Sequence, residues 1–294
     1  MMQLHFPDDE AECAQRLFDA KWPNGIVCPR CGQRYFYSIC SRRYPLYQCR
    51  TCGHQTSLTA GTVMEGSRTP LSKWFQAIRY LSAGISATQL HRLIGVTYKT
   101  AWLINHKLRR AIQEADRKWQ LSGQVHIKGI FYAERRFHPS IYFHPREQPL
   151  LAGATVNRQG LPVQVKIKKV LKTETHYRSI HRRDGEQFLK NHVESAVRSQ
   201  AHCTLHRFGN AEYVPLVALC KHAFRWMSDT FCGIGSKHLQ AYLDEFSYRY
   251  NLSADVDSFV EHVTILAANT RKRPYSWIIR CHLFEEEDLI SNAA

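Results

Sequence analysis

Four cysteines near the start of the chain have the type and spacing of a metal site. Cys28 and Cys31 form one C-x2-C pair, Cys49 and Cys52 form a second, and 17 residues separate the two pairs. Two such pairs supply four thiolates, which is the tetrahedral sulfur ligand set that Zn²⁺ prefers. The sequence therefore predicts a structural zinc ion held by these four cysteines.

The flanking sequence favours this interpretation over a pair of disulfides. Gly32 and Gly53 each follow the second cysteine of a pair, where a tight metal-binding turn needs a residue that can adopt a positive φ. Disulfides are expected in secreted proteins, but residues 1–10 lack the apolar segment of a signal peptide and the other six cysteines are scattered. We therefore expect reduced thiols and a small module that needs zinc in order to fold.

Composition points to a polyanionic partner. The 294 residues carry a formal net charge of +15, and no run of about 18 apolar residues occurs, so no membrane partner is expected. A protein this basic most often binds nucleic acid. A basic surface without a partner is the alternative, but residues 66–118 hold ten lysines or arginines against two acids, Glu114 and Asp116. We expect double-stranded DNA as the partner and a cytoplasmic, nucleoid-associated protein.

The cysteines must be positioned by a short helix and three strands. A helix is expected over residues 7–24, because the acids in its first turn suit the positive end of the helix dipole. Strands are expected at residues 34–39, 43–48 and 55–63. We assign residues 1–64 to an N-terminal helix and zinc ribbon.

Residues 65–120 have the pattern of a helix-turn-helix domain. After a first helix beginning near residue 71, Ser86 is placed to cap a second helix over residues 87–94, and Gly95 is placed to end it. A longer basic helix follows over residues 98–115. A short helix, a glycine-containing turn and a longer helix predict a helix-turn-helix, with an ordinary helical hairpin as the alternative.

In a helix-turn-helix the second helix enters the major groove with its N-terminal side chains on base edges. The first residues of the basic helix are therefore the candidates for base contacts: Thr97, Tyr98, Lys99 and Thr100. Polar and basic residues farther along are the candidates for phosphate contacts: Asn105, Lys107, Arg109 and Arg110.

From about residue 121 the pattern changes to strands. These are expected at residues 125–133, 140–143, 150–156 and 163–170, with a turn at residues 157–160. A helix over residues 184–199, a strand at 203–208 and helices over 214–228 and 237–250 follow. This order predicts an α/β domain with a mixed sheet over residues 121–294. Lys166 and Lys168 alternate on one face of a strand, which we interpret as a track for the DNA backbone, extended by residues 271–273; a solvated edge strand is the alternative.

Three passages carry a family likeness. The first is the two cysteine pairs with their glycines, the second is TAGTVM at residues 59–64 with PLSKWF at residues 70–75, and the third is FCGIGSKHLQAYLDEFSYRYN at residues 231–251. In these passages the chain resembles bacterial insertion-sequence transposases, over roughly residues 10–270. The resemblance implies a multi-domain α/β protein, in which a zinc ribbon and helix-turn-helix precede a ribonuclease-H-like mixed sheet with flanking helices.

The resemblance also implies a metal site for phosphodiester chemistry. In such enzymes two aspartates and a third residue, Glu or Asn, hold two metal ions that activate the attacking oxygen and stabilise the leaving one. The matching positions of this chain hold Lys128, then Arg207 or Phe208, then Val214 and Val217. None is a carboxylate, so we predict no catalytic residues and a need for Mg²⁺ only if a catalytic site exists elsewhere.

A cation at a ligand position repels Mg²⁺ at close range, whereas Lys128 or Arg207 suits a phosphate. The nearby acids lie outside the expected strand positions: Glu134, Glu147, Asp184, Glu186, Glu212 and Asp229. A metal site rebuilt from these acids, or one built on some of the 16 histidines, stays open as an alternative.

Three hypotheses about function follow. The first is a transposase-derived DNA-binding protein, acting as a homo-oligomer, that has lost phosphoryl-transfer chemistry. The second is an active transposase that performs metal-dependent DNA strand cleavage and transfer with an unorthodox carboxylate set. The third is an interaction module of another protein's machinery, which weak DNA binding that does not respond to salt would favour.

Overall fold

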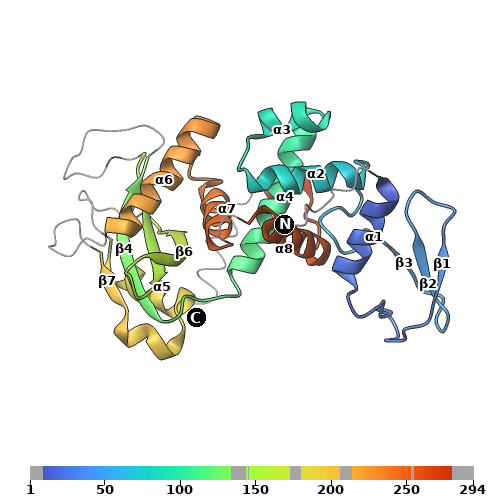
Figure 1. Cartoon of the computed structure of the whole chain (residues 1–294), viewed down its shortest axis with the longest axis horizontal. Helices are drawn as coiled ribbons and strands as arrows, with labels where there is room; N and C mark the ends of the chain where they lie inside the picture. The colour runs from blue at the N-terminus through green and yellow to red at the C-terminus, as the bar shows by residue number, and fades with distance from the viewer. Residues whose placement is uncertain are drawn as a thin grey trace. The chain divides into compact units, whose positions relative to one another are not determined.

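The computed structural model describes residues 9–133, 144, 146–172, 180–205, 214–252 and 255–279. Contacts divide them into two compact units, one within Met1–Ala111 and Asp255–Ile279 and the other within Ile112–Ala254 (Figure 1). The strand expected at residues 140–143 and the second half of that expected at 203–208 lie outside the described residues. The division into domains at residues 64 and 120 stays a prediction.

The first unit begins with a helix and three strands, as predicted, and the strands pair antiparallel. Helix α1 (Glu10–Lys21) starts at Asp9, whose carboxylate accepts a hydrogen bond from the N–H of Glu12. The strands are β1 (Phe36–Ile39), β2 (Leu46–Cys49) and β3 (Gln55–Ser57), in the order β1-β2-β3. The ring centroids of Phe18 in α1 and of Trp22, which follows α1, each lie 5.4 Å from that of Tyr47 in β2, and 5.2 Å from one another.

The third strand is shorter than the predicted range of residues 55–63. After Ser57 the chain forms turns, in which the Thr62 hydroxyl donates to the carbonyl of Thr59 at 2.8 Å and accepts from the N–H of Met64 at 3.1 Å. Such local side-chain bonds offer the backbone an alternative to a strand ladder. Lys21 of α1 holds this turn by donating to the carbonyls of Leu58 and Ala60, at 2.9 and 2.6 Å.

Three helices follow close to the predicted residue ranges: α2 (Leu71–Ser82), α3 (Ala87–Ile94) and α4 (Tyr98–Asp116). The predicted ends of α3 are confirmed. Ser86 and Gln89 form a reciprocal capping box at its start, and Gly95 at its end has a φ of 66°, in the left-handed region. The start of α2 is capped from a distance, because the Glu10 carboxylate accepts the N–H groups of Leu71 and Ser72 at 2.7 and 3.0 Å.

The chain returns to the first unit near its end. Helix α8 (Val256–Asn269) packs against α1 and α2, and α9 (Tyr275–Ile279) follows it. The carbonyl of Ala267 accepts the N–H of Val63 at 3.0 Å, and the Asn269 amide donates to the carbonyl of Ala20 at 3.2 Å. These two helices and their contacts were not among the elements predicted from the sequence.

The second unit is built on a mixed sheet, as predicted, and four of its strands lie within the described residues. Its strands are β4 (Gln124–Tyr132), β5 (Gln148–Val156), β6 (Pro162–Lys169) and β7 (His202–Thr204), in the order β6-β5-β4-β7. The first three pair antiparallel, and β7 pairs parallel to β4. The predicted turn between β5 and β6 is confirmed, since the Asn157 side chain accepts the N–H groups of Gln159 and Leu161.

Helices cover both faces of this sheet. Helices α6 (Val214–Phe231) and α7 (Leu239–Asn251) pack on the face that carries Val165 and Ile167 (Figure 1). Helix α5 (Arg182–His192) packs on the opposite face through Phe188. Gly153 of β5 permits this approach, because a Cβ atom there would lie 2.7 Å from the Phe188 ring.

Helix α5 ends earlier than the predicted range of residues 184–199. The N–H of Leu121 donates to the carbonyl of His192 at 2.8 Å, and the N–H of Glu194 donates to the carbonyl of Leu121 at 2.9 Å. This bridge holds Val193 extended, with a φ of −125°, and a short 3₁₀ helix (Ser195–Gln200) follows. Pairing with a distant segment thus interrupts a pattern that is locally helical.

Helix α7 covers the free edge of β6. The Asn251 amide accepts from the N–H of Val165 at 2.7 Å and donates to its carbonyl at 2.9 Å. In the same way, the Gln240 amide accepts a hydrogen bond from the N–H of Lys169 at 2.7 Å and donates one to the carbonyl of Ile167 at 2.9 Å. These side chains satisfy backbone groups that an open edge would offer to another chain. Both residues belong to the passage at residues 231–251. Part of the sequence that carries the family resemblance therefore has a structural role in this fold.

Candidate zinc centre and nucleic-acid interface

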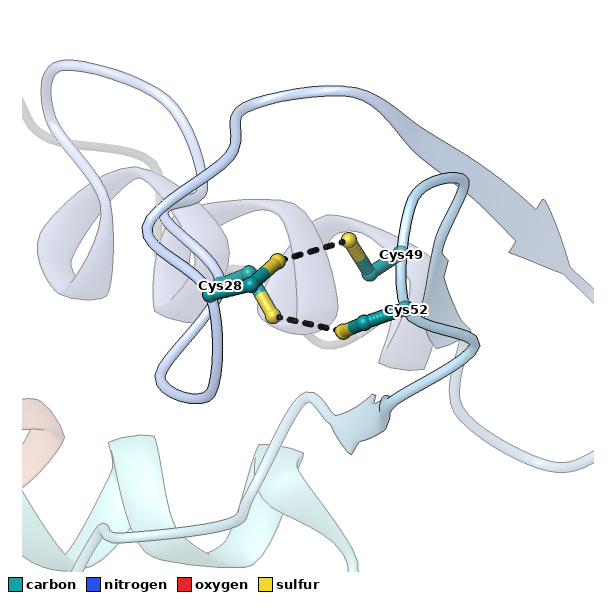
Figure 2. A group of neighbouring side chains, drawn as sticks. Cys28, Cys49 and Cys52 are labelled. Carbon is teal, nitrogen blue, oxygen red and sulfur yellow. Dashed lines mark hydrogen bonds between the residues drawn. The ribbon is translucent and has the colours of Figure 1, made fainter.

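The four predicted cysteines come together in the first unit. The Sγ atoms of Cys28 and Cys52 are 3.6 Å apart, as are those of Cys31 and Cys49, and all four lie within 4.8 Å of one another. Four sulfurs at 2.3 Å from a tetrahedral zinc ion would be separated by about 3.8 Å. Figure 2 shows the sulfurs of the two pairs facing each other. The donor set and its spacing therefore fit one structural zinc ion.

The two halves of this centre have the same backbone construction. In each, the N–H of the glycine donates to the carbonyl of the first cysteine, at 2.9 Å for Gly32 and 3.0 Å for Gly53. Both glycines have the positive φ that the sequence predicted, 73° and 69°. The N–H of Cys52, with that of Thr51, lowers the pKa of the Cys49 thiol to about 6. Backbone geometry thus prepares a thiolate, the form that binds metal.

The structure contains no disulfide among the cysteines that it describes. The four cysteines of the ribbon are also the one group of three or more potential metal ligands that gathers within the described part of the chain. The described helices include none with the length and apolar character needed to cross a membrane.

The residues predicted to contact bases lie at the exposed start of α4. Thr97, Tyr98 and Lys99 are exposed and Thr100 is half-buried. The Thr97 hydroxyl accepts the N–H of Thr100 at 3.2 Å, so this side chain caps the helix. Tyr98 and Lys99 are therefore the side chains that the first turn of α4 offers to a partner.

The residues predicted to contact phosphates are placed differently. Asn105 and Arg109 are buried, with 1% and 2% of their surface exposed. Lys107 donates to the carbonyl of Val63 at 2.9 Å, and burial lowers its pKa. The Arg110 guanidinium lies 4.4 Å from the centre of the Trp277 ring. Asn105 and Arg109 are thus buried and Lys107 is half-buried, because neighbouring segments cover more of the surface of α4 than its pattern of apolar residues indicates.

Lys166 and Lys168 share one face of β6, as predicted, but that face is not solvated. The ammonium of Lys166 is 3.0 Å from Oδ2 of Asp116. That of Lys168 bonds the same carboxylate and lies 2.6 Å from Oδ1 of Asp244. Two carboxylates inside the unit take the place that phosphates would have, so we leave these lysines out of the proposed DNA surface.

The positions that correspond to the family's metal ligands are only partly described. Lys128 lies on β4 and is buried, in register with Thr204 of the parallel strand β7. Val214 is exposed at the start of α6, and Val217 is partly buried one turn later. Arg207 and Phe208 lie outside the described residues, as do Glu134 and Glu212. Of the other acids considered, Glu147 is buried and accepts the N–H of His144 at 3.1 Å. Asp184, Glu186 and Asp229 lie on helices.

Comparison with known proteins connects this centre to mobile elements. Residues 8–55 match the family model of the transposase zinc-ribbon domain. The N-terminal module is similar to a transposase zinc ribbon. The chain is also 33% identical over 133 residues, 45% of its own length, to an uncharacterized protein in transposable element ISH50 of Halobacterium salinarum. It spans about half the length of that curated relative, since the match covers 45% of it. No solved structure matches the chain.

These matches support two predictions. The four cysteines, identified from their spacing, fall within a module of the transposase zinc-ribbon type. The likeness to insertion-sequence proteins, identified from three short passages, is supported by the relative from a transposable element. The chain thus carries a transposase-type zinc ribbon, which is followed by helices and a mixed α/β unit.

Proposed function

We propose that this protein is a transposase-derived DNA-binding protein whose second unit has lost metal-dependent phosphoryl transfer. The observation that carries the proposal is the continuity of a transposase-type zinc ribbon with helices α2–α4, whose last member presents Tyr98 and Lys99 to solvent. In this proposal α3 and α4 form a helix-turn-helix around Gly95, and the start of α4 reads base edges in the major groove.

The second unit supports the ribonuclease-H-like assignment by its topology. Three antiparallel strands are followed, after α5, by a fourth strand that pairs parallel to the first. The loss of chemistry rests on Lys128, a buried cation at the position where the family implies an aspartate. We infer that this unit now has an architectural role, including formation of a homo-oligomer on DNA.

An active transposase is the second candidate, and one feature favours it. In the sequence, Glu134 follows the last residue of β4 by two residues and Glu212 precedes the first residue of α6 by two, and both lie outside the described residues. Because β4 and β7 are parallel neighbours, their carboxyl ends meet at the same edge of the sheet. Carboxylates that follow two such strands are the ligand type that Mg²⁺ prefers.

One experiment separates the two candidates. The full chain is incubated with duplex DNA taken from the flanks of its own gene, with Mg²⁺ or Mn²⁺, and binding, nicking and strand transfer are followed together. A shifted band without cleavage supports the proposal. Metal-dependent cleavage that Glu134→Gln or Glu212→Gln abolishes would establish the second candidate instead. The absence of any shifted DNA band at low salt would overturn DNA binding itself. Light scattering of the protein–DNA complex is a separate test of the homo-oligomer.

A further inference from the structure

The connection from α8 to α9 (residues 270–274) leads into a residue that contacts the start of α4, Tyr275, the first residue of α9. Tyr275 is far from α4 in sequence, but the Nζ atom of Lys99 lies 5.3 Å from the centre of its ring. The rings of Tyr275 and Trp102 are 6.0 Å apart. Two contacts one turn apart on α4 therefore place the basic run Arg271, Lys272 and Arg273 next to the residues proposed to read bases.

This segment is anchored at both ends. Lys272 forms an ion pair with Glu65 at 2.9 Å. On the other side, the Trp277 ring lies 4.4 Å from the guanidinium of Arg110 and 5.1 Å from that of Arg273, and Ile278 is buried. These contacts give the segment a defined position on the first unit.

Between the anchors the segment is open to solvent. Arg271, Arg273 and Tyr275 are all exposed, Tyr275 by 44%. Among the described residues, no carboxylate pairs with either arginine. Acids are also absent from the sequence on both sides of the contact, over residues 66–113 and 262–284. Within the described residues, Arg271, Arg273 and Lys99 are therefore exposed cations that no ion pair neutralises.

We propose that residues 271–275 form a second contact with duplex DNA, beside the groove that α4 enters. Arg271 and Arg273 bind backbone phosphates, because a guanidinium matches phosphate oxygens in a bidentate geometry. Tyr275 is a positioning residue, whose ring holds the Lys99 ammonium by a cation–π contact and orients it toward the DNA. This inference rests on the proposed function and assigns a task to the end of the chain that the helix-turn-helix hypothesis does not include.

The test compares two double variants of the full chain. Arg271→Ala with Arg273→Ala removes the proposed phosphate contacts. Arg182→Ala with Arg183→Ala removes two exposed arginines of α5 in the second unit and is matched in charge. Binding to a labelled duplex from the flanks of the gene is measured by fluorescence anisotropy over a series of salt concentrations, and thermal unfolding verifies that each variant folds.

We expect the first variant to bind at least about tenfold more weakly and to reduce the slope of log K against log salt by about 1.8, for two phosphates. The control variant, with Arg182 and Arg183 replaced, should keep the affinity and the salt slope of the unmodified chain. The proposed function stands if the unmodified chain binds DNA with a steep salt slope and Lys99→Ala weakens that binding. If the variant with Arg271 and Arg273 replaced then keeps full affinity and slope, this inference is overturned. If the unmodified chain does not bind DNA, the proposed function fails first.

Tyr275 is tested by its coupling to Lys99. Tyr275→Phe keeps the ring and should retain full affinity, whereas Tyr275→Ala should bind about two- to fivefold more weakly. In a chain that already carries Lys99→Ala, the second change should have little further effect, because the contact is already absent. Additive effects in the two backgrounds would contradict the positioning role.

Discussion

The ammonium group of Lys166 lies 3.0 Å from Oδ2 of Asp116, and neither side chain is more than 2% exposed. Lys168 bonds the same carboxylate and also that of Asp244, so two lysines and two aspartates form one cluster within the second unit. Asp116 is the last residue of α4. The cluster therefore fastens the end of that helix to β6 and α7. Buried charges of this kind stabilise only while each keeps its partner.

Removing the central cation should therefore be costly. Lys168→Met leaves the carboxylate of Asp244 with its amide contacts from Gln240 and Gln113 but without a cation. We expect the free energy of unfolding to fall by about 3 kcal/mol, measured by urea denaturation. Lys190→Met, at an exposed position on α5, is the control and should change it by less than about 0.5 kcal/mol. Equal effects would contradict a buried, paired Lys168.

Lys166 should also give stability a pH dependence. Burial lowers its pKa from 10.5 to about 8, although Asp116 opposes the shift. The unfolded chain then binds more protons than the folded one between these values, so this group's contribution to stability rises from about pH 8 to pH 10.5. Subtracting the unfolding free energies of Lys166→Met from those of the unmodified chain isolates the effect. A difference that stays flat over this range would show that Lys166 is not buried as described.

Zinc should be bound by the ribbon and required for its fold. One zinc ion per chain is expected from metal analysis, and its removal by a chelator should expose the amides of β1 and β2 to hydrogen exchange. Cys49→Ser should lose the metal, because it removes one of the four thiolates, whose formation the backbone N–H groups of Cys52 and Thr51 favour. The exposed Cys203 is the matched control, and Cys203→Ser should keep one zinc ion. Retention of full zinc by the Cys49 variant would exclude the four-thiolate centre.

Two cations of α4 should behave in opposite ways. Lys99→Ala, at an exposed position, should weaken DNA binding by about 1–3 kcal/mol if it contacts a base, without a change in melting temperature. Arg109→Ala, at a buried position, should instead lower the melting temperature. Anisotropy and thermal unfolding of both variants give the comparison. A loss of DNA affinity in a fully stable Arg109 variant would restore the original prediction that it contacts phosphate.

The edge of β6 should depend on α7. Asn251→Ala leaves the N–H and carbonyl of Val165 without their side-chain partner, which we expect to cost about 1–3 kcal/mol. Faster hydrogen exchange at Val165 and a greater tendency to aggregate should accompany the loss. Asn191→Ala, at an exposed position on α5, serves as the control. Unchanged exchange at Val165 would contradict edge protection by Asn251.

Several features of the fold could be predicted because they depend on residues close together in sequence. The capping box of Ser86 and Gln89 spans three residues, and each cysteine pair with its glycine forms a single turn. The alternation of Lys166 and Lys168 on one face also follows from strand geometry alone. The predicted ends of β3 and α5 were wrong where other contacts intervened, at Thr62 and at the bridge between Leu121 and Val193.

The sequence by itself determined the zinc ligands, the helix caps, the positive charge and the likeness to insertion-sequence proteins, since each is a property of local spacing or composition. Only the tertiary structure decided what the charged side chains face. Asp116 neutralises Lys166 from 50 residues away, and the return of α8 brings Tyr275 under Lys99. The same residue type, lysine, is buried in one place and presented to solvent in the other, because its surroundings come from distant parts of the chain.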